Sequence, residues 1–545
     1  MADRVQSYKV ICSGGLNSNE NHLDLAENYP GVATRLVNYE ISDYGGYRRV
    51  LGFDEYDTTY GEVGAGSATG KVLGVFLFKD TTTQQDMILA ARKDSGANTY
   101  KFYKYVFGTG WVAQSTGITH NTTKSTLTVA KIRHTKFNFG SGNHIVFVDG
   151  VNHAVVFDGT AWKEIKVSNS GGTSSPGGVM ALDAPTVVEV FENHLFLGSQ
   201  RTKLSVVAHS APQDPFTWTA AAGSGQSQIG FDLVNFKPFR DDLFLFGSNE
   251  IKKLTADVSS GFNLSQVTAN VGCIARDSVL EIGGDLVFLA PDGLRPVAGT
   301  SRIGDVELET ISKPIQLILS TLSNDFDLDT LNGLVIRSKS QLRYFIGDTT
   351  HAVIDSFGII GGLRTSDQRI GWEFGELIGI RASCCTSGYV GTTELVLHGD
   401  YDGKIYKQEN GKSFNGADIV GVYTTPYFDF GDTEVRKTLR KINTFVRAEG
   451  PFTMNLGVTY DWDDPTTSVP SSYSEESLGA PVRYKGTNIN YAGANINYGG
   501  NDKPIMVTNV QGSGFAAQVT YVTVGQFDPH SIQGIVFEFS AAGRK

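Results

Sequence analysis

A short apolar strand that recurs along the chain constrains the fold more than any other feature of the sequence. Each copy has about five residues, usually opens on a polar or small residue, and is followed by a turn rich in Asp, Gly, Asn or Ser and by a returning strand. The clearest copies start at residues 87, 144, 194, 242, 285, 333 and 394. Successive starts therefore lie between 43 and 61 residues apart.

A repeat of roughly 40–50 residues that holds enough strand for a four-stranded sheet is typical of a β-propeller. The continuous apolar runs fit inner blade strands that are buried on both faces between neighbouring blades. The 63 glycines are dispersed along the chain, and glycine supplies the positive φ that tight turns need. We therefore predict an all-β fold with a β-propeller of six or seven blades over residues 71–418. The best helical pattern is short and covers residues 311–322.

The segments on either side of the repeat have a different pattern. Residues 1–70 are predicted to be an irregular β segment that packs with the C-terminal domain. Residues 419–545 contain longer alternating strands, for example 441–447 and 534–539, and are predicted to form a separate C-terminal β-sandwich-like domain. Within this domain, residues 488–501 repeat an Asn-Ile-Asn-Tyr heptad in tandem, which predicts an exposed loop rich in Asn, Tyr and Gly.

The charge balance and the apolar runs exclude several classes of function. The chain has 46 Lys and Arg against 57 Asp and Glu, a formal net charge of −11. Proteins that grip nucleic acid or an anionic membrane normally carry a basic excess. No run approaches 18 apolar residues, which predicts no membrane anchor, and no secretory signal is visible. The four cysteines fit neither a disulfide framework nor a zinc site, so we expect folding in a reducing cytoplasm.

Sequence motifs for catalysis or metal binding are weak. Residues 399–403 superficially resemble a calcium loop, but they lack the distal Glu, and Asp-Gly between two strands is a hairpin signal. Asp461 and Asp463 could be paired carboxylates of a glycoside hydrolase, although acidic residues before a proline are more often a solvated turn. We expect no enzymatic activity, no metal and no cofactor. The alternative is a propeller glycosidase or carbohydrate-binding module that acts on bacterial envelope sugars.

Two features of the C-terminal domain are candidates for contacts with a partner. Four positive charges within six residues suit an acidic patch on a partner or a neighbouring subunit, although a solvated strand face is the simpler interpretation. This basic patch consists of Arg436, Lys437, Arg440 and Lys441. In the tandem loop, Asn offers adaptable hydrogen bonds and Tyr offers rigid aromatic area. The candidate contact residues of the loop are Asn488, Tyr491, Asn495 and Tyr498.

Several segments carry a resemblance to a known family. They are the glycine–arginine–aromatic run at 45–53, the propeller segments 192–198, 216–218, 242–248 and 285–293, and the run Thr-Thr-Pro-Tyr-Phe-Asp-Phe at 424–430. Together they resemble the tail-nozzle, or packaged-DNA-stabilisation (tail tube), proteins of short-tailed bacteriophages. The likeness covers most of the chain, while the tandem heptad has no counterpart in it.

The resemblance implies a structural virion protein of the phage tail with no enzymatic activity, made and folded in the host cytoplasm. Six copies would form a homo-hexamer below the portal and the adaptor protein, near the needle or plug and the tailspike or fibre proteins. The ring would form the channel that retains packaged DNA and conducts it during ejection. Double-stranded DNA would pass without specific binding, and an acidic wall would repel its phosphates.

Overall fold

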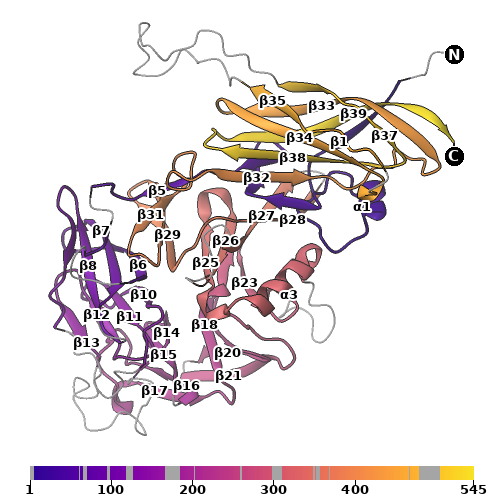
Figure 1. Cartoon of the computed structure of the whole chain (residues 1–545). Coiled ribbons are helices and arrows are strands. Elements are labelled where there is room, and N and C mark those ends of the chain that lie inside the picture. The colour runs from indigo at the N-terminus through magenta and orange to yellow at the C-terminus, as the bar shows by residue number, and fades with distance from the viewer. Residues whose placement is uncertain are drawn as a thin grey trace.

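The computed structural model confirms the all-β fold, with 55% strand and 8% helix, and with a β-propeller and additional C-terminal sheets. Figure 1 shows the propeller below and the C-terminal sheets above it. No helix among the described residues has the length and apolar character needed to cross a membrane. The structure describes residues 5–544 except 60–61, 65–69, 95–97, 118–126, 166–183, 202, 258–260, 298–309, 348–349, 351–355, 367–368, 465–466 and 478–503.

Six small antiparallel sheets are the blades of the propeller. Blade one contains β6 (Val72–Lys79), β7 (Asp86–Lys93), β8 (Tyr100–Val106) and β9 (Gly110–Ala113). Blade two contains β10 (Arg133–Asn138), β11 (Asn143–Val148), β12 (Val155–Phe157) and β13 (Trp162–Glu164). Blade three contains β14 (Val187–Phe191), β15 (His194–Gln200), β16 (Lys203–His209) and β17 (Gly225–Gln228).

The remaining blades follow the same order. Blade four contains β18 (Leu233–Phe239), β19 (Asp242–Gly247), β20 (Ile251–Asp257) and β21 (Gly261–Thr268). Blade five contains β22 (Leu280–Ile282), β23 (Asp285–Ala290) and β24 (Gly293–Pro296). The last blade contains β29 (Cys384–Val390), β30 (Thr393–Gly399), β31 (Ile405–Gln408) and the N-terminal strand β5 (Phe53–Glu55). Because β5 comes from the start of the chain, it closes the ring.

A seventh unit fills the ring between blade five and the last blade. It contains β25 (Asn332–Ile336), β26 (Gln341–Ile346), β27 (Phe357–Ser366) and β28 (Arg369–Glu376). Strand β25 contacts β22 on one side and β29 on the other. This unit is not a sheet of its own, because β28 pairs with β2 (Arg35–Val37) and the sheet continues into the C-terminal domain.

The continuous apolar strands are explained by packing between blades, as the sequence predicts. In β15, Leu195 and Leu197 pack into the cluster that contains Val146 of blade two. Phe196, on the opposite face of the same strand, packs with Leu243 of blade four. Since side chains alternate across a strand, both faces of the inner strands need apolar residues.

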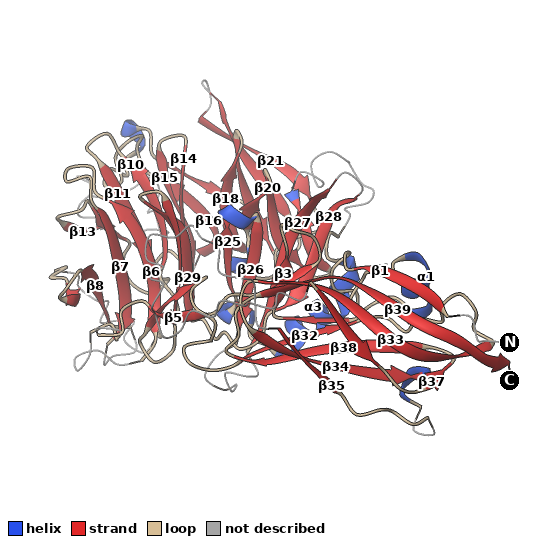
Figure 2. Ribbon diagram, turned by 90° about the horizontal axis from the view of Figure 1, so that it is seen from above, coloured by secondary structure: helices blue, strands red, loops and turns tan. Residues whose placement is uncertain are grey.

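The C-terminal domain is a sandwich of two sheets, which extend to the right in Figure 2. One sheet contains β1 (Gln6–Ile11), β3 (Tyr39–Ile41), β4 (Tyr47–Arg49), β33 (Val435–Ala448), β36 (Ile505–Asn509), β37 (Ser513–Gly514) and β39 (His530–Arg544). The other continues from β28 and β2 through β32 (Ile419–Thr424), β38 (Ala517–Gly525), β34 (Phe452–Tyr460) and β35 (Tyr473–Ser477). Strand β34 alternates buried and more exposed residues, which is the pattern of a strand with one face in a core.

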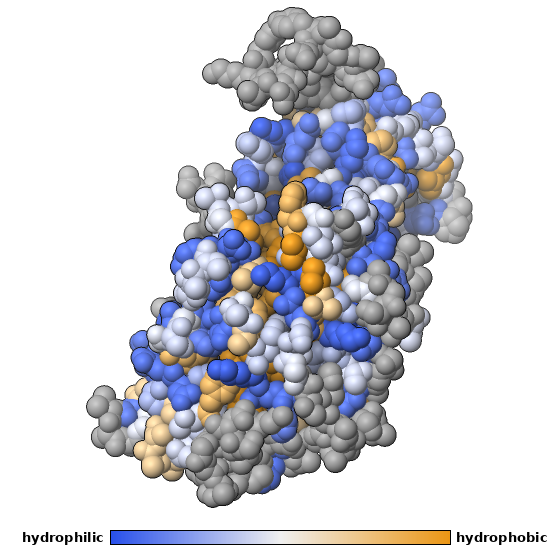
Figure 3. All heavy atoms as spheres, turned by 90° about the vertical axis from the view of Figure 1, so that its left-hand side faces the viewer, coloured by the Kyte–Doolittle hydropathy of each residue, from blue (hydrophilic) through white to orange (hydrophobic). Residues whose placement is uncertain are grey.

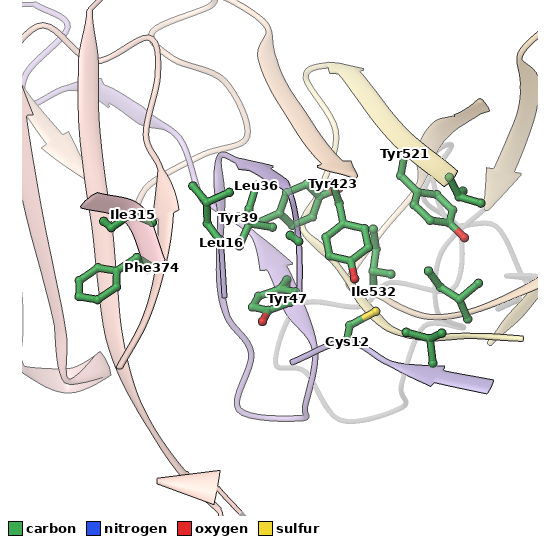
Figure 4. Packing of buried hydrophobic residues seen from close by; sticks show 14 of the residues in the cluster. Cys12, Leu16, Leu36, Tyr39, Tyr47, Ile315, Phe374, Tyr423, Tyr521 and Ile532 are labelled. Carbon is green, nitrogen blue, oxygen red and sulfur yellow. The ribbon is translucent and has the colours of Figure 1, made fainter. Parts of the chain in front are cut away.

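Residues 1–70 do not form a unit of their own. β1, β3 and β4 belong to the sandwich, β2 joins the propeller sheet to the sandwich, and β5 belongs to the last blade. A single apolar core reaches from the propeller into the sandwich, with Ile315 and Phe374 at one end and Tyr521 at the other (Figure 4). The two parts of the chain are therefore continuous in both sheet and core.

Helices are few and short among the described residues. The α-helices are α1 (His22–Asn28) and α3 (Gln316–Asp325). The 3₁₀ turns are η3 (Ala220–Ala222), η4 (Arg276–Ser278), η5 (Lys313–Ile315), η6 (Leu328–Thr330), η7 (Arg337–Lys339) and η9 (Asp461–Asp463). The predicted helix at 311–322 corresponds to η5 and α3, with Pro314 in the opening turn, where its missing N–H is tolerated.

Candidate functional site

The axis of the propeller is a small polar cavity of about 230 Å³. The first strand of each of the six blades and of the seventh unit, or the turn just before it, contributes to its wall. Lys131 lies just before β10, and Arg133 is the first residue of β10. Both form ion pairs with Asp277 of η4, with N–O distances of 2.8 and 2.7 Å. These two cations hold the pKa of Asp277 well below its usual range despite the burial that opposes ionisation.

A second ion pair crosses the wall of the same cavity. Lys237 of β18 is paired with Glu189 of β14, and Thr135 donates a 3.0 Å hydrogen bond to the same carboxylate. Ion pairs thus join blade two to the η4 turn before blade five, and blade three to blade four, and the Thr135 hydrogen bond links blade two to blade three. A cavity of this volume is far too small for a DNA duplex, whose major groove alone is about 12 Å wide.

The distinctive run at residues 45–53 lies at the junction between propeller and sandwich. A side chain at Gly46 would place Cβ 2.0 Å from the carbonyl oxygen of Ile532, and its φ is +74°, so only glycine fits. Tyr47 donates a 3.1 Å hydrogen bond to Glu373 of β28. Arg49 is fully buried and donates to the carbonyl oxygens of Ile419, Gly525 and Phe527 at 2.5–2.8 Å.

A charged network surrounds Glu40 at the same junction. Its carboxylate, in the sandwich strand β3, accepts hydrogen bonds from Arg48 at 2.9 Å and from Lys339 of η7 at 2.7 and 2.9 Å. Arg343 of β26 approaches it at 3.3 Å and also pairs with Glu409, which follows β31. Lys339 and Arg343 together hold the pKa of Glu409 at about 2 against the effect of burial. The junction is therefore locked by ion pairs as well as by the shared core.

The structure separates the four residues of the predicted basic patch. Lys437 is 3% exposed, and its ammonium donates to the carbonyl oxygens of Asp432 and Phe515. Arg436 donates to the side chain and the carbonyl oxygen of Ser513 at 3.0 and 2.9 Å. Arg440 and Lys441 are exposed.

The other predicted contact and catalytic residues have different outcomes. The loop residues Asn488, Tyr491, Asn495 and Tyr498 lie outside the described residues. Asp461 lies in η9, where its Oδ1 accepts hydrogen bonds from the backbone N–H groups of Phe515 and Ala516 at 2.6 and 3.2 Å. Its carboxylate is therefore engaged in holding the turn.

The predicted hairpin at 399–403 has the geometry of a turn. Oδ1 of Asp400 accepts hydrogen bonds from the N–H groups of Asp402 and Lys404 at 2.9 and 2.7 Å. Across the described ranges, no cluster of three or more His, Cys, Asp or Glu side chains could hold a metal ion.

Sequence reasoning missed an apolar area on the outward face of the sandwich. The strand register forms a row of residues across four neighbouring strands. In order, this row contains Ile11 of β1, Gly534 of β39, Phe445 of β33 and Ile505 of β36. The next row contains Lys9, Val536, Asn443 and Val507, and its Lys9 is exposed. Four apolar side chains of these rows are exposed: Ile11 by 60%, Phe445 by 36%, Ile505 by 42% and Val507 by 51%.

We call Ile11, Phe445, Ile505, Val507 and Val536 the outer apolar face. Lys441 lies one row further along β33, opposite Asn509 and Glu538, and so borders this face. The signal in the sequence is the run Ile-Met-Val in β36, which is apolar on both sides of a strand that has only one buried side.

The outward side of the second sheet also carries exposed valines. Val420 of β32 and Val524 of β38 are direct cross-strand partners and are 44% and 50% exposed. The sandwich thus has an apolar area on each of its two outward faces.

Figure 3 shows the side of the molecule that lies at the left in Figure 1. On this side, hydrophobic side chains lie in a band between hydrophilic ones.

Comparisons with known proteins give no family for this chain. No family model matches it, and no curated protein matches it.

Proposed function

We propose that the chain is a structural subunit of a ring, the hexameric tail nozzle of a short-tailed phage, without enzymatic activity. The observation that carries the proposal is the outer apolar face on a sandwich joined to the propeller by a shared sheet and core. Exposed apolar side chains that gather on one sheet are typical of a protein–protein contact. The family resemblance of the sequence supplies the phage tail as the setting.

A closed ring of identical chains needs two different contact surfaces on each subunit, one for each neighbour. The outer apolar face and the Val420–Val524 pair lie on opposite outward faces of the sandwich. Head-to-tail contact between them would bury both areas. The ion pairs and shared core of the junction would then fix the orientation of each propeller in the ring.

In such a ring, DNA would pass between the subunits, because the cavity at the axis of each propeller is small and is lined by paired charges. A net charge of −11 per chain disfavours tight contact with phosphates and suits a conduit past which DNA slides. The proposed partners are therefore further copies of this chain, the adaptor above them, and neighbouring needle and tailspike or fibre proteins.

Negative-stain electron microscopy of the purified protein tests the proposal. We expect six-fold rings with an open centre for the wild type and isolated particles for Phe445→Lys, because the lysine puts a charge into the contact. Phe107→Lys is the matched control, since Phe107 is 93% exposed on the β8–β9 turn of the propeller and should leave the rings intact. Isolated wild-type particles at every protein concentration would refute the proposal.

We do not propose the glycosidase alternative as a second function. The Asp461 carboxylate that it requires is held by two backbone N–H groups. Among the described residues of the C-terminal domain, no further observation favours hydrolysis.

A further inference from the structure

The cavity at the propeller axis, which we call the axial cavity, has more positive than negative side chains in its wall. Among the described residues that line it, Lys131, Arg133 and Lys237 are cations, and Glu189 and Asp277 are carboxylates. The whole chain has a net charge of −11, so this excess of positive charge is local. Charge that is not balanced costs free energy inside a protein, because part of its hydration is lost. A bound anion would balance it.

The other titratable side chains in the wall do not supply the missing negative charge. Burial, followed by repulsion from Lys136 and Lys237, lowers the pKa of His134 to about 3, so its ring is neutral at neutral pH. Burial raises the pKa of the Cys384 thiol to about 11 and also raises the pKa of Cys385. Both thiols are therefore neutral, and the wall keeps its positive excess.

Arg133 has hydrogen-bond donors that the protein does not use. Its Nε and Nη2 donate to the two carboxylate oxygens of Asp277 at 2.8 and 2.7 Å. Its Nη1 has no partner in the described part of the chain, and this atom is not fully buried. Since a guanidinium has five N–H donors, Nη1 and the second hydrogen of Nη2 form a free fork. Such a fork fits two oxygens of one oxyanion.

The two lysines of the wall also have donors to spare. An ammonium group has three N–H donors. Lys237 uses one of them, on Glu189, as far as the described residues show. Lys131 uses two, on Asp277 and on the carbonyl oxygen of Leu331, both at 2.8 Å. The wall can therefore surround an anion with donors from blade two and blade four.

The size of the axial cavity restricts the ligand to a small ion. Its volume of about 230 Å³ is several times the share of one water molecule in the liquid, about 30 Å³. Sites for larger organic ligands usually measure about 300–1,000 Å³. The side chains of Lys237 and Arg133 are 37% and 16% exposed, so solvent reaches the donors that an ion would meet.

From these observations we propose that the axial cavity binds one small oxyanion of the phosphate or sulfate class. The free fork of Arg133 holds two of its oxygens, and the ammonium groups of Lys131 and Lys237 bind the others. The site lies within each propeller, and it does not rest on the proposed ring.

Isothermal titration calorimetry of the full chain with inorganic phosphate, at neutral pH and constant ionic strength, tests the proposal. We expect saturation at one phosphate per chain. Chloride and AMP are the comparison probes. Chloride lacks the paired oxygens that fit a guanidinium fork, and the base and ribose of AMP need more room than the cavity has. No saturable binding of phosphate, or binding of chloride or AMP that is as tight, would overturn the assignment.

Two substitutions in one ion pair separate the charge of the site from its folding. Lys237→Gln removes a cation and should weaken phosphate binding about 10-fold, near the lower end for a hydrogen bond to a charged group, because Lys237 is partly exposed. Glu189→Gln removes a carboxylate and should tighten binding at least about 5-fold, the effect of one repelling charge about 4 Å away in water. Both variants break the same ion pair, so a purely structural effect would move both affinities in the same direction. That result would contradict the site.

Lys253→Gln is the matched control. Lys253 also lies in blade four, its side chain is also 37% exposed, and it pairs with Asp242 as Lys237 pairs with Glu189. Among the described residues, the wall of the axial cavity does not include Lys253. Phosphate affinity should therefore stay at the wild-type value in Lys253→Gln. A loss as large as that in Lys237→Gln would show that phosphate binds elsewhere and would overturn the proposal.

Discussion

Replacement of Arg49 by methionine is the sharpest perturbation of the propeller–sandwich junction. The guanidinium is fully buried and donates to three backbone carbonyls, those of Ile419, Gly525 and Phe527. Methionine keeps most of the apolar stem but has no donor. Ile419 is the first residue of β32, Gly525 is the last residue of β38, and Phe527 lies in the loop that follows β38.

The expected loss of stability follows from these three acceptors. A buried acceptor left without a partner costs about 1–3 kcal/mol. Removal of the buried guanidinium recovers part of its desolvation, so the net loss should be about 3–6 kcal/mol. For a unit of about 150–250 residues, each kcal/mol shifts the melting temperature by about 2–4 °C. The transition that includes the sandwich should therefore fall by on the order of 10 °C.

Differential scanning calorimetry measures this shift, and the neighbouring residue provides the control. Arg48 is 17% exposed, and without it Glu40 still keeps Lys339 and Arg343. Arg48→Met should therefore cost clearly less than Arg49→Met. A shift for Arg49→Met no larger than that for Arg48→Met would refute the view that Arg49 locks the junction.

Two further predictions concern buried charge. Asp277→Asn removes the carboxylate that pairs with Lys131 and Arg133 at the propeller axis. Unfolding in urea should show a free energy of unfolding lower by about 3 kcal/mol. This value is near the lower end for a broken buried ion pair, because the side chain of Asp277 is 21% exposed. Burial lowers the pKa of His398 and His530 to about 3, below the value of about 6.5 in the unfolded chain. The unfolded state then binds more protons, so this stability is present above about pH 6.5 and falls as the pH drops towards 3. His398→Gln should flatten that pH dependence in thermal melts, and an unchanged slope would contradict it.

The repeat of buried strands was predictable because it is local. Runs such as Leu195-Phe196-Leu197 must be apolar on both sides between two blades, and this appears directly in the sequence. The alternation in the C-terminal strands predicted the sandwich for the same reason. Both patterns depend on burial alone, not on the identity of the pairing partner.

Pairings between distant segments were not predictable from local patterns. β5 has only three residues, and nothing in them specifies that they pair with β31 near residue 406. The junction with β28 through β2 is equally non-local. The ion pairs at the propeller axis are also non-local, since Lys237 and Glu189 are 48 positions apart and Arg133 and Asp277 are 144 positions apart.

The basic patch shows the limit of reading charge from sequence. Arg436, Lys437, Arg440 and Lys441 are close in the chain, but side chains alternate across β33 and the strand is bulged between Val435 and Lys437 and again between Leu439 and Lys441. Lys437 therefore points inward to backbone carbonyls, while Lys441 stays at the surface beside the outer apolar face. Its role in a partner contact stays a prediction.

The mass of the assembly in solution tests the central claim, that this chain is a ring subunit, most directly. Light scattering coupled to size-exclusion chromatography should give six times the chain mass of 58.9 kDa for the wild type at high protein concentration. Phe445→Lys should give the mass of one chain under the same conditions. A wild-type mass of one chain up to the solubility limit would contradict the account.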